Sequence, residues 1–393
     1  ARYFEVSEEE CISLAKQAAE LGAERFVLDD GWFKGRHNDE TSLGDWSADE
    51  AKFSNGLMPL IDAVHAGGME FGLWLEPEMV SSDSDLCRNH PDWVLGWPEA
   101  ELATGRNQLV LDLSLPAVRE HLFVTIAALL DAYPISYVKW DCNRDLYPAT
   151  SGGVASLGSQ TEGLYEILDR LRIAYKVQIE SCASGGGRID AGIASRTDRF
   201  WASDTTDAID RLRVQRAVTF VMPTERLGCH IGPSPNPMTG REISMEFRVL
   251  AALFGHMGIE ANPAHFNDSD KAILTRGLEI YKAHRDWMGD GQLLNLSEPG
   301  DDPDLQMLVA VGGDQALLRI MRVNTPVRPL QPRIRLAGLD QQSHYELVEL
   351  ALRGDQMAWP LGNVMGRGLM HDGLVLDSAR ALTGRLIHLR KTE

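Results

Sequence analysis

The sequence predicts an α/β protein with a (β/α)8 TIM barrel followed by a small antiparallel β-sandwich domain. Over residues 1–290, helical patterns alternate with short apolar strands, which is typical of parallel βαβ units. From about Gly291, strand patterns follow one another with turns between them and no long helix. No GxGxxG motif follows a strand, which disfavours a doubly wound sheet. We therefore expect a catalytic barrel over 1–290 and an antiparallel β-domain over 291–393.

The first barrel helix begins at Ser7, which is spaced from Glu10 as in a capping box. Gly22 ends this helix, and the apolar strand Glu24–Leu28 follows it. Later helices are predicted over Leu57–Ala66, Pro116–Tyr133 and Glu162–Tyr175, and later strands over Met69–Leu75, Ile135–Trp140, Val177–Ser181 and Arg199–Ala202, with two more ending near Cys229 and Glu260. The opening strand would be Arg2–Val6, so we expect strand one to be truncated.

The C-terminal domain and one loop complete the predicted elements. Strands are predicted over Leu305–Val311, Ala316–Met321, Arg333–Leu336, Tyr345–Leu350 and Arg385–Arg390. The segment Ser151–Ser159 is rich in glycine and serine, which predicts a loop at the rim of the barrel.

The charge of the chain excludes several classes of partner. With 38 Lys and Arg against 57 Asp and Glu, the net charge is −19. Such a protein repels phosphate backbones and anionic lipids, so we expect no nucleic acid or membrane partner, whereas a neutral sugar is compatible. The five cysteines contain no CxxC pair, residues 1–13 lack the pattern of a signal peptide, and we expect reduced thiols and a cytoplasmic location.

Two acidic residues at strand ends are candidates for catalysis. Asp141 ends the strand that carries Lys139 on the same face, and the ammonium group would keep this carboxylate ionised, as a nucleophile requires. Asp204 follows the strand Arg199–Ala202, and a pair of opposed carboxylates is what glycosidic cleavage needs. The alternatives are a structural ion pair for Lys139 and Asp141, and a turn for Asp204. Asp207, which precedes a predicted helix, is better explained as its cap.

Other strand ends carry candidates for ligand binding. Asp29 and Asp30 place two carboxylates on one turn, where sugar hydroxyls would satisfy them; an ordinary Asp-Gly turn is the alternative. Trp74 could present an aromatic face to a sugar or belong to the core. Arg106 offers a planar set of donors or a surface charge. The run Cys182–Arg188 has three glycines, which let a backbone approach a ligand closely.

Metal and cofactor motifs do not occur in the sequence. The eleven histidines form no HxH or HExxH pattern, and neither a calcium-binding loop nor a GxSxG elbow is present. We therefore expect no metal and no cofactor, and the acidic residues are the one coherent catalytic set.

Six motifs in order resemble the α-galactosidases of glycoside hydrolase family 36. They are DDGW, LWLEPEMVSSDSDL, GRNQLVLDLS, YVKWDCNR, SCASGGGR and SDTTDAIDRL, and the resemblance runs from Ala1 to about Met288. The segment Arg333–Leu339 resembles the C-terminal domain of that family more loosely.

The resemblance implies a retaining mechanism with Asp141 as the nucleophile and Asp204 as the general acid/base. Asp29 and Asp30 would bind the 4- and 6-hydroxyls of galactose. The residues implied to line the same subsite are Trp74, Arg106, Lys139, Cys182 and Gly185, with Asp207 as a further candidate.

The sequence departs from the family pattern in three ways. Cys142 replaces the methionine usual after KWD, Ser184 stands where many members have glycine, and the large N-terminal β-domain of the family is absent from this sequence. That domain helps to build a neighbouring active site in tetrameric members, so the resemblance makes an oligomer possible without defining it.

We therefore expect hydrolysis of terminal α-1,6-linked galactose from melibiose or raffinose-type sugars, with the two carboxyl groups about 5–5.5 Å apart. A galactosyl transferase similar to raffinose synthase and an α-N-acetylgalactosaminidase are the enzymatic alternatives. A galactose-binding relic or an incomplete fragment is the non-enzymatic alternative.

Overall fold

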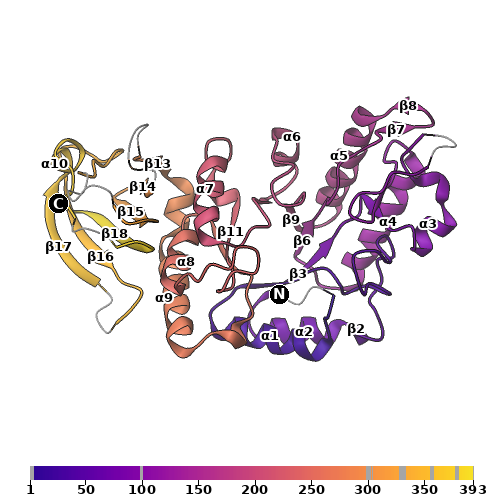
Figure 1. Cartoon of the computed structure of the whole chain (residues 1–393), viewed down its shortest axis with the longest axis horizontal. Coiled ribbons are helices and arrows are strands. Elements are labelled where there is room, and N and C mark those ends of the chain that lie inside the picture. Colours follow the sequence, from indigo (N-terminus) through magenta and orange to yellow (C-terminus); the bar gives the residue numbers. More distant parts are fainter. Residues whose placement is uncertain are drawn as a thin grey trace. The chain divides into compact units, whose positions relative to one another are not determined.

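The computed structural model describes residues 4–97, 101–297, 302, 304–326, 333–354, 358–376 and 380–392. Contacts divide the chain into two compact units, Ala1–Asp204 and Thr205–Glu393, which are described separately below. Figure 1 shows both units and labels most of their helices and many of their strands.

The first unit contains five parallel strands in the order β1-β3-β6-β9-β10. Their bounds are β1 Arg25–Leu28, β3 Glu70–Leu75, β6 Tyr137–Trp140, β9 Gln178–Ser181 and β10 Arg199–Trp201. The helices between them are α1 Glu8–Glu20, α2 Met58–Ala66, α4 Pro116–Ala132, α5 Leu157–Ala174 and α6 Ala191–Ala194. Helices α4 and α5 lie side by side (Figure 1). The predicted alternation of helices and parallel strands is confirmed, because each strand returns to its neighbour through a helix.

Parallel pairing brings the carboxyl ends of these strands to one edge of the sheet. Asp29 follows β1, Glu76 follows β3, Asp141 follows β6 and Cys182 follows β9. Asp204 lies three residues beyond the end of β10. In β/α barrels this edge is where chemistry takes place, so the fold gathers the candidate site residues of this unit.

The start of the chain and the rim of the barrel differ from the predictions. Of the strand predicted over residues 2–6, residues 4–6 are not a strand and the others lie outside the described residues; β1 is the first strand within the described part of the chain. The segment 151–159 is no simple loop, because it contributes to a hairpin and then begins α5 at Leu157. The remaining short elements of this unit are β2 Ser54–Leu57, β4 Met79–Val80, α3 Asp85–Asn89, η1 Pro91–Trp93, β5 Leu109–Val110, β7 Thr150–Ser151 and β8 Val154–Ala155.

The first helix shows how the local sequence sets its own boundary. The Ser7 hydroxyl accepts a hydrogen bond from the Glu10 backbone N–H at 3.4 Å, as the predicted capping box requires. Cys11 and Ala15 lie on the buried face, and the backbone of Gly22 turns away at φ +91°. The helix therefore ends where the glycine allows a left-handed residue.

The second unit combines two parallel strands with an antiparallel sheet. Strands β11 and β12 pair in parallel, and the antiparallel strands follow the order β13-β14-β15-β18-β16-β17. The elements are α7 Ala208–Val218, η2 Thr224–Arg226, β11 Leu227–Ile231, α8 Met245–Ala252, β12 His256–Ile259, η3 Pro263–His265, α9 Asp268–Asp290, β13 Gln292–Asn295, β14 Leu305–Gly312, β15 Gln315–Arg322, β16 His344–Leu350, β17 Ala358–Met365, α10 Gly366–His371 and β18 Thr383–Thr392.

The antiparallel domain is confirmed, and its described strands form one sheet rather than two stacked sheets. Ile334, Leu336 and Leu339 cover one face together with Leu369 of α10, in a core shared with β14, β15, β16 and β18. The strand predicted over 333–336 is wrong, because this segment makes only an isolated bridge from Ile334 to Leu374. This segment packs its apolar side chains onto the sheet and does not pair with a neighbouring strand over its length.

The other face of this sheet packs against helix α8. The Arg319 side chain is buried and donates from Nη1 to the carbonyl oxygens of Leu250 and Ala251, at 3.0 Å each. These carbonyls belong to the last turn of α8, where no intrahelical donor remains, so the guanidinium caps the helix. No described helix is both long and apolar enough to cross a bilayer.

Candidate active site

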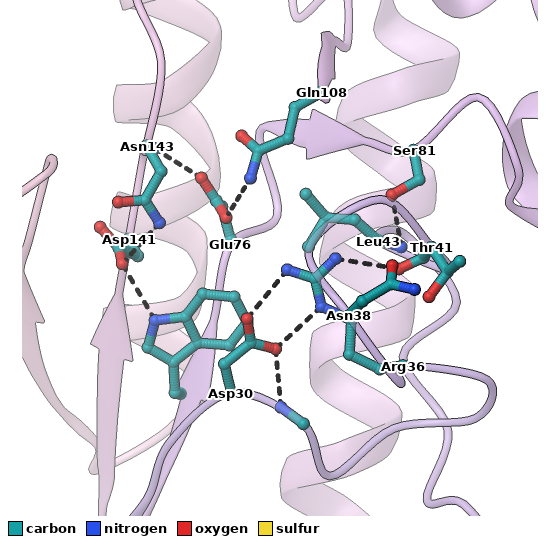
Figure 2. Close-up of polar contacts among 12 residues, drawn as sticks. Asp30, Arg36, Asn38, Thr41, Leu43, Glu76, Ser81, Gln108, Asp141 and Asn143 are labelled. Carbon is teal, nitrogen blue, oxygen red and sulfur yellow. Dashed lines mark hydrogen bonds and ion pairs between the residues drawn. The ribbon is translucent and has the colours of Figure 1, made fainter. Parts of the chain in front are cut away.

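Asp141 is held at the end of β6 by three hydrogen-bond donors. Its Oδ2 accepts from Asn143 Nδ2 at 2.8 Å (Figure 2). The same oxygen accepts from Trp74 Nε1 at 3.0 Å, and Oδ1 accepts from the Cys142 backbone N–H at 2.9 Å. The residue is only 6 % exposed. Donors on both oxygens fix the orientation of the carboxyl group, which is what a nucleophile aimed at one atom needs.

Trp74 reaches Asp141 from the neighbouring strand β3. Its ring lies parallel to that of Phe33, with centroids 6.4 Å apart, and at an angle to that of Trp46, with centroids 6.1 Å apart. Trp74 is only 2 % exposed, so its ring is packed as a core residue. Its polar edge nevertheless serves the site, because the indole N–H is a donor with no acceptor capacity.

Asp204 lies at the exposed edge of the same unit. Its Oδ1 accepts a hydrogen bond from Trp201 Nε1 at 3.0 Å. Partial burial and then the negative charge of Asp141 raise the pKa of Asp204, while the charge of Lys139 opposes the rise. A carboxyl group whose pKa is raised beside a second carboxyl group is suited to give a proton to a leaving oxygen.

Lys139 pairs with Asp29 rather than with Asp141. Its Nζ lies 2.8 Å from Asp29 Oδ2 and 4.4 Å from the centroid of the Trp201 ring. Burial disfavours the charged lysine, but Asp29 and further negative groups outweigh it and raise the pKa of Lys139. The surrounding protein also disfavours an ionised Asp29, yet the ammonium group outweighs this and lowers its pKa. Lys139 and Asp141 therefore interact through their charges without a direct ion pair. The direct ion pair, between Lys139 and Asp29, joins β6 to the turn after β1.

Asp30 is clamped by a buried arginine. Arg36 donates from Nε to Oδ1 at 3.0 Å and from Nη2 to Oδ2 at 2.8 Å (Figure 2). The Gly31 N–H donates to Oδ1 at 2.6 Å. Burial raises the pKa of Asp30 despite the arginine. Neighbouring Asp29 and Asp30 thus coexist because each has a separate cation.

Arg106 is presented by a tight hairpin before β5. Gly105 and Gln108 exchange backbone hydrogen bonds at 3.1 and 3.0 Å, and Arg106 and Asn107 have φ values of 50° and 61°. Two left-handed residues in a two-residue loop are the geometry of a type I′ turn. The exposed Arg106 then donates from Nη1 to Asn143 Oδ1 at 3.0 Å and to Ser184 Oγ at 3.3 Å.

The glycine run after β9 packs against the segment that ends in Asp204. A Cβ on Gly185 would lie 2.7 Å from Ser203 Cα and 2.9 Å from the Asp204 backbone nitrogen, and the φ of Gly185 is +83°. A Cβ on Gly186 would lie 2.4 Å from the Ala202 carbonyl oxygen. The glycines therefore let this run approach another segment of the chain closely, and the predicted approach to a ligand stays a prediction.

A family model described as Melibiase matches residues 1–291 of the chain. The chain belongs to the melibiase family. A second model, the glycosyl hydrolase family 36 C-terminal domain, matches residues 305–389. The resemblance of the six motifs to glycoside hydrolase family 36 is therefore confirmed.

Relatives of this family include named α-galactosidases. An α-galactosidase of Escherichia coli is 43 % identical over 346 residues, which are 88 % of this chain and 49 % of the relative. The crystal structure of the family 36 α-galactosidase AgaA of Geobacillus stearothermophilus is 35 % identical, with a TM-score of 0.92, and covers 100 % of this chain and 54 % of that chain. A variant of AgaA in complex with raffinose matches with a TM-score of 0.91. The chain spans about half the length of the curated relatives it matches. These matches confirm the predicted fold class.

Most residues singled out from the sequence lie in the first unit. The residues of that unit are Asp29, Asp30, Trp74, Arg106, Lys139, Asp141, Cys182, Gly185 and Asp204. Cys182 is 1 % exposed, and burial followed by the charge of Asp141 raises the pKa of its thiol, so the group stays neutral.

Asp207 lies in the second unit and has the contacts of a helix cap. Its Oδ1 accepts from the backbone N–H groups of Ile209 and Asp210 at 2.9 and 3.2 Å and from Arg241 Nη1 at 3.0 Å. Thr239 donates its hydroxyl to Oδ2 at 2.6 Å. The side chain has no exposed area, and these contacts confirm the cap of α7 that the sequence favoured, whereas the ligand contact implied by the resemblance stays a prediction.

Several polar residues of the site were missed by the sequence analysis. Buried Glu78 accepts from Trp140 Nε1 at 2.8 Å and from Arg188 Nη1 at 2.9 Å, and Arg36 clamps Asp30. Glu76, Gln108 and Asn143 form a network beside Asp141 (Figure 2). The available signal for Glu76 was its position directly after β3, because Asp29 and Asp141 are candidates on account of the same position after their own strands.

Among the residues that the structure describes, no group of three or more His, Cys, Asp and Glu side chains could hold a metal ion.

Proposed function

We propose that the chain carries the active site of a retaining α-galactosidase. The substrates would be terminal α-1,6-linked galactosides such as melibiose and raffinose-type sugars, and simple α-galactosides. One observation carries the proposal: two carboxyl groups in one unit lie in unlike surroundings. Asp141 is buried and held by three donors, whereas Asp204 is exposed and its pKa is raised. Two carboxyl groups in such different surroundings can divide the roles of nucleophile and general acid between them.

In the first step Asp141 attacks the anomeric carbon while Asp204 gives its proton to the glycosidic oxygen. A galactosyl ester of Asp141 forms, and the aglycone leaves as an alcohol. In the second step Asp204, now ionised, removes a proton from water, which attacks the anomeric carbon and releases Asp141. The raised pKa of Asp204 supports its role in the first step, since the group must be protonated before the aglycone leaves.

The remaining site residues would bind the galactose. We assign the hydroxyl groups of the sugar to Asp29 and Asp30, whose cations Lys139 and Arg36 hold them in place. Arg106, on the hairpin, would donate hydrogen bonds to the sugar. Gly185 and Cys182 would line the subsite, and Trp74 would act by holding Asp141. Relatives named α-galactosidases and an AgaA variant bound to raffinose support this choice of substrate.

We also propose the organisation and location of the protein. A boundary between domains near 290 is supported by the two matched models, which meet between 291 and 305. A cytoplasmic location is supported by five free cysteines, none of them paired within the described part of the chain. An oligomer stays a prediction from the family.

The test is release of nitrophenol from para-nitrophenyl α-galactoside, with the β-anomer as the control substrate. We expect turnover of the α-anomer alone, lost in Asp141→Asn and kept in Asp169→Asn, which changes a surface carboxylate paired with Arg196. Proton NMR of the first product should show α-galactose. Turnover that survives in Asp141→Asn, β-galactose as the first product, or no turnover from a folded sample would refute the proposal. Transfer of galactose to sucrose as an acceptor would indicate the galactosyl transferase, and turnover of a nitrophenyl α-N-acetylgalactosaminide would indicate the α-N-acetylgalactosaminidase.

A further inference from the structure

Glu76 is a buried acid that the mechanism above does not use. It follows β3 directly, as Asp141 follows the adjacent strand β6, and its side chain has no exposed area. A buried carboxyl group is costly unless hydrogen bonds satisfy it. Its contacts therefore indicate why it is there.

Each oxygen of Glu76 accepts a hydrogen bond from a different loop. Oε1 accepts from the backbone N–H of Asn143 at 2.5 Å, and Oε2 accepts from Gln108 Nε2 at 3.0 Å (Figure 2). Asn143 lies two residues after Asp141, and Gln108 closes the hairpin that presents Arg106. Glu76 thus joins the loop of the proposed nucleophile to the hairpin of a proposed sugar-binding residue.

The Asn143 side chain also connects the proposed nucleophile Asp141 to Arg106 of the hairpin. Its Nδ2 donates to Asp141 Oδ2 at 2.8 Å, and its Oδ1 accepts from Arg106 Nη1 at 3.0 Å. Both contacts depend on where the Asn143 backbone lies. The hydrogen bond to Glu76 holds that backbone, so a change at Glu76 would reach Asp141 and Arg106 together.

We propose that Glu76 is a positioning residue for galactoside cleavage, which holds the Asn143 backbone and the Gln108 side chain and thereby aligns Asp141 and Arg106. The proposal rests on the α-galactosidase function proposed above. It makes Glu76 act through its neighbours, since it contacts neither reacting carboxyl group directly.

The neutral form of Glu76 is the form that suits this role. Burial, followed by the charge of Asp141, raises the pKa of Glu76 to about 8, so the group is mostly protonated at neutral pH. A neutral acid adds no charge beside the nucleophile. The Gln108 Oε1 atom is buried without a partner among the described residues, and rotation of that amide would let it accept the Glu76 proton. Glutamine, which is neutral and of the same shape, should therefore replace Glu76.

The test compares Glu76→Gln, Glu76→Leu, Asn143→Ala and the double variant Glu76→Leu/Asn143→Ala on para-nitrophenyl α-galactoside. Loss of one charge-assisted hydrogen bond at Asp141 corresponds to about a 30-fold fall in kcat/KM. We expect a fall of this order in Glu76→Leu and in Asn143→Ala, and activity within about threefold of the parent in Glu76→Gln. Because Glu76 reaches Asp141 through Asn143, and the Asn143 side chain also contacts Arg106, the double variant should lose little more than Asn143→Ala alone.

Three results would overturn the proposal. They are unchanged kcat/KM in folded Glu76→Leu, a strong loss in Glu76→Gln, or losses that multiply in the double variant. If Glu76→Leu does not fold, Glu76→Asp replaces it, because the shorter side chain keeps the acid but cannot reach both donors. A merely structural role would lower the melting temperature and leave kcat of the folded enzyme unchanged.

A crystal structure of Glu76→Leu gives a readout that does not depend on turnover. We expect the contact between Asn143 Nδ2 and Asp141 Oδ2 to be lost, and its retention at 2.8 Å would refute the positioning role. If the parent chain shows no turnover, the proposed function fails, and the positioning role is judged on this structure alone.

Discussion

Replacing Gly185 by alanine is expected to displace the proposed acid Asp204. The new Cβ would lie 2.7 Å from Ser203 Cα and 2.9 Å from the Asp204 nitrogen, whereas ordinary contacts begin at 3.4 Å. The backbone of one segment must therefore shift by about 0.7 Å, because neither contact involves a flexible side chain. A misplacement approaching 1 Å costs up to about 100-fold in rate, so we expect kcat/KM to fall by about 10- to 100-fold.

The control is Gly68→Ala. Gly68 has a φ of +75°, close to the +83° of Gly185, but a Cβ there would meet nothing within 4 Å. Both variants carry the cost of a left-handed alanine, about 1 kcal/mol of unfolding free energy, which urea denaturation measures. Gly185→Ala alone adds the collision, and so it alone should lose activity.

The choice of substrate shows which group has moved. Melibiose needs a proton on its leaving oxygen, whereas nitrophenolate leaves readily without one, so the loss in kcat/KM should be larger for melibiose. Equal kcat/KM in Gly185→Ala and Gly68→Ala would refute the reasoning. Equal losses for the two substrates would show that the shift does not act through Asp204.

Three other perturbations have defined outcomes. Asp207→Ala removes the cap of α7, so urea denaturation should show that the unfolding free energy falls by about 1–2 kcal/mol, with KM for the galactoside unchanged; a raised KM would support the ligand contact that the resemblance implies. In Lys139→Met the basic limb of the pH profile of kcat/KM should move to higher pH, because the charge of Lys139 lowers the pKa of Asp204; an unmoved limb would contradict this. The folded pKa of Glu76, about 8, exceeds its usual 4.5, so the folded protein holds the proton more tightly and unfolding free energy should fall as pH rises from about 4.5 to 8. Glu76→Gln should flatten that slope, and an equally steep slope in the variant would assign it to other groups.

The order of elements and the family could be predicted from the sequence alone. Apolar periods and glycine positions locate helices and strands, because burial of one face is a local property of the chain. The positions of Asp29, Asp141 and Asp204 at strand ends follow from the same pattern, since parallel strands share an edge. Predictions failed where a segment has no period of its own, as at 333–336 and 151–159.

Partners of the site residues were decided by the tertiary structure. Lys139 shares a strand face with Asp141, yet its ion pair is with Asp29, which lies 110 residues away in the chain. Trp74 belongs to the core and also donates to Asp141 across 67 residues. Such contacts depend on which loops meet at the edge of the sheet, and no local pattern records that.

The sequence by itself determined which residues are acidic, where strands end and which family the motifs resemble. Only the tertiary structure decided which acid is charged and which is neutral, because burial and neighbouring charge set those states. Asp29 and Glu76 illustrate the difference. Both follow strands of one sheet, but a lysine lowers the pKa of the first, whereas burial beside Asp141 raises the pKa of the second.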